Sequence, residues 1–101
     1  MNKQGATGPR VADAVRGLFH SERAEDLVRR LEDGITMETP GVSTVAGLER
    51  VRLAALKCSD GDLAKLDAAI ALANRDFRDL LMAAGFSDPM AHLDWRPGGE
   101  D

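Results

Sequence analysis

The 101-residue chain has very little cysteine and no long apolar run. Its lone cysteine, Cys58, cannot form a disulfide within the chain, so the even cysteine framework common in small secreted domains is missing. No apolar run follows Met1–Gly5, so we expect no secretory signal peptide. All apolar stretches are much shorter than the roughly 20 residues that span a membrane. We therefore expect a cytoplasmic protein with no membrane partner.

Sequence motifs that bind metals or cofactors are also missing. His20, Cys58 and His92 are too far apart in the sequence to form the closely spaced ligand pairs of zinc sites. Asp60 and Asp62 lack the additional spaced oxygens and the closing glutamate of an EF-hand loop. The chain contains neither of the glycine-rich nucleotide-binding motifs G-x-x-x-x-G-K-[ST] and G-x-G-x-x-G. We therefore expect neither a metal nor a cofactor.

Nucleophilic side chains stand at positions that structural roles explain. Cys58 continues an apolar helical face, where a free cysteine usually behaves as an inert small hydrophobe. Four serines stand at natural helix starts, where a hydroxyl can cap the backbone, namely Ser21, Ser43, Ser59 and Ser87. A nucleophile needs an adjacent base, and no sequence motif supplies one. We therefore expect no enzymatic activity.

The composition is that of an ordinary globular protein, with 44% hydrophobic and 30% charged residues and a net charge of −4. The length allows one domain. Residues 1–58 contain nine Lys/Arg and eight Asp/Glu, whereas residues 59–101 contain four and nine. An acidic second half repels phosphate backbones, so we expect no nucleic-acid partner for it.

Helical spacing begins after a polar, glycine-rich segment, residues 1–9, which we interpret as a flexible tail. Pro9 suits the first turn of a helix, because its missing N–H is not needed there. The apolar side chains that follow share one helical face: Val11, Val15, Leu18 and Phe19. Ser21 is a candidate N-cap for a second helix, which Gly34 ends.

Residues 35–43 are predicted to be a loop, because Pro40-Gly41 marks a turn and the chain offers no second strand. Ser43 or Thr44 can cap a third helix, which continues to Cys58 with a broad apolar stripe and is therefore predicted to be central. Ser59, with Asp62 three residues later, resembles a capping box that opens the next helix.

A regular seam of apolar residues follows, made of Leu63, Leu66, Ile70, Ala73, Phe77, Leu80 and Ala84. Its heptad-like spacing fits one helix over about 61–84 or two helices broken at Asn74, and we favour the break. Gly85 ends this region, and Asp88-Pro89 opens a last short helix. The prediction is an all-α, compact single-domain bundle of five to six short helices over residues 10–97, with a flexible C-terminus at 98–101.

Our leading functional hypothesis is a small protein–protein interaction or regulatory protein that forms a homodimer or binds another protein. The seam could mediate self-association, and Gly17 and Gly47 within helices could permit a close helix approach. Aromatic residues are enriched at interface hot spots, and three stand near the C-terminus: Phe77, Phe86 and Trp95. The same side chains could instead fill the core.

The alternative hypothesis is a helix-turn-helix-like nucleic-acid-binding protein. Residues 52–58, 59–61 and 62–73 have the outline of that motif. A recognition helix needs hydrogen-bond donors at its start, however, and this one has Asp62, Lys65 and Asp67. A better basic patch, interleaved with acids, consists of Arg23, Arg29 and Arg30.

Overall fold

The computed structural model describes residues 9–19, 24–86 and 95, which contain five α-helices and no strand. The helices are α1 (Pro9–Leu18), α2 (Ala24–Gly34), α3 (Val45–Ser59), α4 (Leu63–Arg75) and α5 (Phe77–Ala84). This confirms the all-α bundle and the loop at residues 35–43. Of the tail predicted at residues 1–9, Pro9 instead begins α1, and residues 1–8 lie outside the described residues. The Ser21 cap, the last short helix and the C-terminus at 98–101 also lie outside them.

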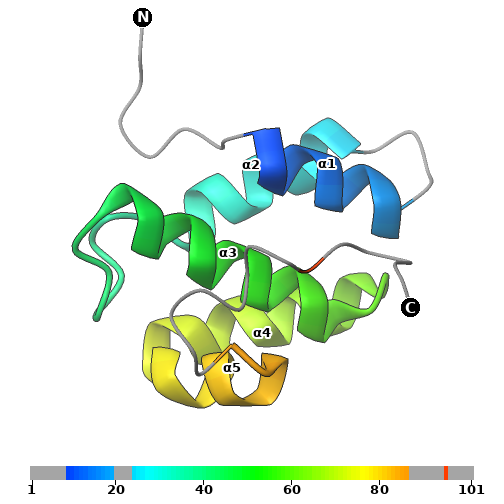
Figure 1. The fold of residues 1–101 in the computed structure, drawn as a ribbon. Coiled ribbons are helices and arrows are strands. Elements are labelled where there is room, and N and C mark those ends of the chain that lie inside the picture. Colours follow the sequence, from blue (N-terminus) through cyan, green and yellow to red (C-terminus); the bar gives the residue numbers. More distant parts are fainter. Residues whose placement is uncertain (1–8, 20–23, 87–94, 96–101) are drawn as a thin grey trace, which may run out of the picture.

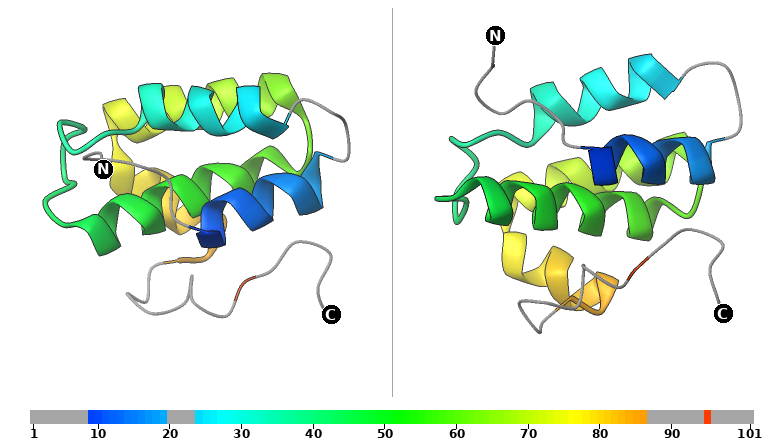
Figure 2. Two further views of the ribbon diagram at one scale, coloured as in Figure 1. Left: turned by 90° about the horizontal axis from the view of Figure 1, so that it is seen from above. Right: turned by 45° about the horizontal axis from the view of Figure 1, so that its top comes forward.

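Helix α3 lies in the middle of the molecule and contacts α1, α4 and α5 (Figure 1). Its residues 53–56 have no exposed surface, as expected for a helix covered on more than one side. Helix α2 closes the arrangement by packing on both α1 and α4, as the views in Figure 2 show. The radius of gyration of 12.1 Å is close to the roughly 13 Å typical of compact 100-residue domains.

The core is built from the apolar faces that the helical spacing predicts. Val11 and Val15 of α1 are buried, as are Leu27 and Leu31 of α2. They join the buried side chains of α3, α4 and α5 in one hydrophobic cluster. None of the helices in the described part of the chain has both the length and the apolar character needed to cross a bilayer.

The starts of α3 and α4 are capped by different kinds of residue. Thr44 caps α3, because its Oγ1 accepts a hydrogen bond of 2.9 Å from the Gly47 backbone N–H. Asp62 caps α4 by accepting from the Lys65 backbone N–H at 3.2 Å. The prediction that Ser59 opens α4 is therefore wrong. Ser59 is the buried last residue of α3, and its hydroxyl donates to the Leu56 carbonyl at 2.6 Å.

The break between α4 and α5 is confirmed, but it lies at Asp76 rather than Asn74. The Asp76 backbone is extended, and its carboxylate accepts from the backbone N–H groups of Arg78 and Asp79. Asn74 remains inside α4. Its side-chain amide donates to the Gly34 carbonyl at 2.7 Å, so it connects α4 to the end of α2 instead of capping a helix.

The apolar seam divides at this break, and most of it faces the interior, although Leu63 at its start is 44% exposed. Leu66 and Ala73 of α4 and Leu80 and Ala84 of α5 are all buried. Both helices pack against α3, which covers the positions that a second copy would need. These four seam residues are therefore not available to a second copy in this fold, and self-association itself stays a prediction.

The close approaches between segments occur at glycines other than the one predicted in α3. An added Cβ at Gly47 would meet only the Thr44 Oγ1, at 3.1 Å, so no neighbouring helix requires this glycine. An added Cβ at Gly34 would lie 2.6 Å from the Ile70 Cγ2, where α2 meets α4. At Gly41, where φ is +91°, an added Cβ would overlap the Phe77 ring. These two glycines therefore allow backbone to approach side chains from other elements.

Candidate functional site

The three aromatic residues predicted to form an interface are mainly parts of the core. Phe86 is only 1% exposed, and Trp95 packs edge-on against it with 6.2 Å between the ring centroids. Phe77, the first residue of α5, is half-buried and covers Gly41 in the loop between α2 and α3. Phe86 follows the end of α5. The structure thus brings Phe86 and Trp95 together and places Phe77 at the other end of α5.

Two cationic side chains of α3 hold Phe86 in place. The Arg50 Nη2 donates a hydrogen bond of 2.6 Å to the Phe86 carbonyl oxygen. The Lys57 Nζ lies 5.0 Å from the centroid of the Phe86 ring, which is within the range of a cation–π interaction. These contacts fix the end of α5 against α3, so Phe86 stabilises the fold rather than presenting a free aromatic surface.

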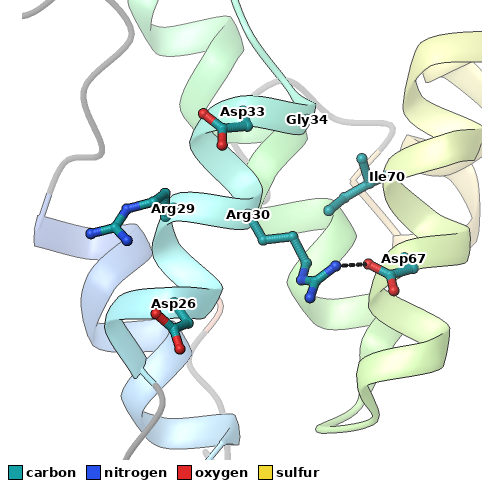
Figure 3. Close-up of a pocket in the computed structure, with 7 residues that line it drawn as sticks. All are labelled: Asp26, Arg29, Arg30, Asp33, Gly34, Asp67 and Ile70. Atoms are coloured by element: carbon teal, nitrogen blue, oxygen red, sulfur yellow. Dashed lines mark hydrogen bonds and ion pairs between the residues drawn. The ribbon is translucent and has the colours of Figure 1, made fainter.

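The positive charge of the predicted basic patch is partly neutralised by an acidic neighbour. Arg23 lies outside the described residues. Arg29 and Arg30 are exposed on α2, and the Arg30 Nη1 lies 3.0 Å from the Asp67 Oδ1 on α4 (Figure 3). This ion pair neutralises one of the two arginines and connects the two helices.

The arginines line an open groove of about 480 Å³ between α2 and α4 (Figure 3). Its lining contains two arginines and three aspartates, in the set Asp26, Arg29, Arg30, Asp33, Gly34, Asp67 and Ile70. Because acids outnumber bases here, the groove does not offer the positive surface that a phosphate backbone requires. A second depression, of about 450 Å³, also combines both signs of charge, with Arg16, Glu25, Arg29 and Glu32 in its wall.

Two helices joined by a short turn are present, as in a helix-turn-helix motif, but the start of the second helix offers few of the side chains that usually recognise bases. α3 and α4 are joined by a short turn in which Asp60 and Gly61 have positive φ angles of 50° and 81°. The exposed residues at the start of α4 include Asp62, Lys65 and Asp67, and Asp67 is paired with Arg30. A base edge in the major groove is commonly recognised by Arg, Lys, Asn or Gln, so this surface gives the nucleic-acid hypothesis no support.

Arg52 is the polar residue whose role the sequence pattern did not reveal. It is 1% exposed, and its Nε donates a hydrogen bond of 2.9 Å to the Ile35 carbonyl just beyond α2. Its Nη2 donates to the Glu32 carbonyl at 3.4 Å. Burial lowers the pKa of the Arg52 guanidinium, and the charge of Glu32 opposes that shift. Arg52 thus satisfies carbonyls at the end of α2, which have no partner within a helix.

Cys58 is half-buried on α3, and it is a free thiol. Burial raises the pKa of this thiol, and the nearby charge of Lys57 lowers it by a smaller amount. Burial thus disfavours the thiolate, which is the form in which a nucleophilic cysteine reacts. Within the described residues, no group of three or more His, Cys, Asp or Glu side chains is arranged to hold a metal ion.

The outward side of α4 is the surface that sequence reasoning overlooked. Ala64, Ala68 and Ala71 follow one another at helical spacing and are all exposed, and we call these three residues the α4 outer face. The opposite side of the helix contains the buried seam residues. α4 therefore exposes three alanines on the side away from the core, and exposed polar residues lie beside and between them: Lys65, Asp67, Asn74 and Arg75. On α5, Met82 is also 67% exposed.

In comparisons with known proteins, no family model, curated protein or solved structure matches this chain significantly.

Proposed function

We propose that this protein acts without catalysis by binding a helix of another protein chain through the α4 outer face. The observation that supports the proposal is that Ala64, Ala68 and Ala71 are exposed together on α4, on the side away from its buried residues. In the sequence, these alanines alternate with the seam residues, so the apolar pattern does not show that they lie on a separate, exposed face.

The geometry favours a helical partner. Interaxial distances between packed helices are about 8–10 Å and depend on the side chains at the contact. Alanines at positions 64, 68 and 71 allow the shortest of these distances. The exposed charges beside these alanines, Lys65, Asp67 and Arg75, would then surround a small apolar patch, and a polar rim of this kind is common in protein interfaces.

A second copy of this chain is the partner that we propose, which makes the protein a homodimer. We also propose that it works in the cytoplasm, because a free thiol such as Cys58 suits a reducing compartment.

Ala68→Arg tests the proposal, because it places a long charged side chain at the centre of the α4 outer face. We expect the wild type to show a dimer in sedimentation equilibrium over a range of concentrations, and Ala68→Arg to be monomeric. Ala46→Arg is the matched control, because Ala46 is exposed on α3 and lies outside the α4 outer face. Circular dichroism should show the same helix content for all three proteins.

A photo-crosslinking residue at position 71, with one at position 46 for comparison, identifies the surface independently. The proposal requires a crosslink to a second copy that forms at position 71 and is lost with Ala68→Arg. A monomeric wild type with no crosslink specific to position 71 would contradict the homodimer. Equal crosslinking at both positions would contradict the surface.

A further inference from the structure

We draw no further inference here: the strongest candidate, the groove between α2 and α4 that Arg29 and Arg30 line, belongs to the candidate site already described, and nothing in the structure shows what occupies it.

Discussion

Single residues of this protein stabilise contacts between segments that are far apart in the sequence. Arg52 on α3 donates to carbonyls at residues 32 and 35, and Gly41 in the loop accommodates the ring of Phe77 from α5. In each contact, the partner lies far away in the sequence, so the local sequence does not identify it. Arg52 needs hydrogen-bond acceptors, and the Phe77 ring needs a residue without a side chain beside it. Stability measurements on single variants can therefore test both contacts.

Arg52→Met should destabilise the fold by more than about 2 kcal/mol. Methionine fills much of the same space but donates no hydrogen bond, and a buried carbonyl left without a partner costs about 1–3 kcal/mol. The free energy of unfolding from urea titrations measures the effect. Arg29→Met is the matched control, because Arg29 is exposed, and it should change stability by less than about 0.5 kcal/mol. Equal effects at both positions would contradict the buried role of Arg52.

Gly41→Ala should also destabilise the protein, by more than about 1 kcal/mol, because alanine is strained at positive φ. The new methyl group would also overlap the Phe77 ring. Urea unfolding of the single variants and of the double variant with Phe77→Ala separates the two causes. We expect Gly41→Ala to cost less when Phe77 is already alanine. An unchanged cost would show that backbone strain alone is responsible.

At the scale of the helices, capping side chains decide where each element begins. Thr44, Asp62 and Asp76 have extended backbones and accept hydrogen bonds from N–H groups that have no partner within the helix. Asp76 is decisive for the architecture, because it ends α4 and begins α5. Without this break, α4 and α5 would form one rod and could not both pack on α3.

Asp76→Ala should lower the stability by about 0.5–2 kcal/mol, the usual cost of losing a capping side chain. Thermal unfolding followed by circular dichroism measures the change. Asp76→Asn is the control, because an amide oxygen can accept the same two bonds, and we expect it to stay close to the wild type. If both variants lose the same stability, the negative charge rather than the hydrogen bonds is responsible.

At the scale of the whole molecule, burial distinguishes the core from the surfaces that can bind a partner. Phe86 and Trp95 close the bundle beside α3, whereas the α4 outer face and Met82 point away from the core. A protein of this size has a small core, so large aromatic side chains contribute much of its stability. The residues proposed for binding are alanines, so the large aromatic side chains remain available for the core.

Phe86→Ala should therefore destabilise the fold by about 3–5 kcal/mol, as is typical when a buried phenylalanine is truncated. Because Trp95 is the only tryptophan in the chain and contacts Phe86, its fluorescence should report the same transition as circular dichroism. Met82→Ala is the control, and we expect less than about 0.5 kcal/mol because Met82 is exposed. A stable Phe86→Ala variant would contradict the core position of Phe86.

Local chemistry in the sequence was sufficient to predict the fold class and most helix positions. Apolar residues at helical spacing, Pro9 at a helix start, Gly34 at a helix end and the turn at Pro40-Gly41 all act over a few residues. Their effects do not depend on what the finished helices contact. This is why the five helices and the loop between α2 and α3 agree with the prediction.

Tertiary structure alone decided which faces are covered, because burial depends on the elements that meet. The spacing of the seam residues and of Phe86 is equally compatible with a surface position, and the packing of α3 against α4 and α5 buries Phe86 and most of the seam. Arginine is a residue type usually found on the surface. The burial of Arg52 is favourable only because carbonyls at the adjacent end of α2 accept its hydrogen bonds. The same packing leaves the alanines of α4 exposed, and their position on the outside of the bundle is the basis for the proposed function.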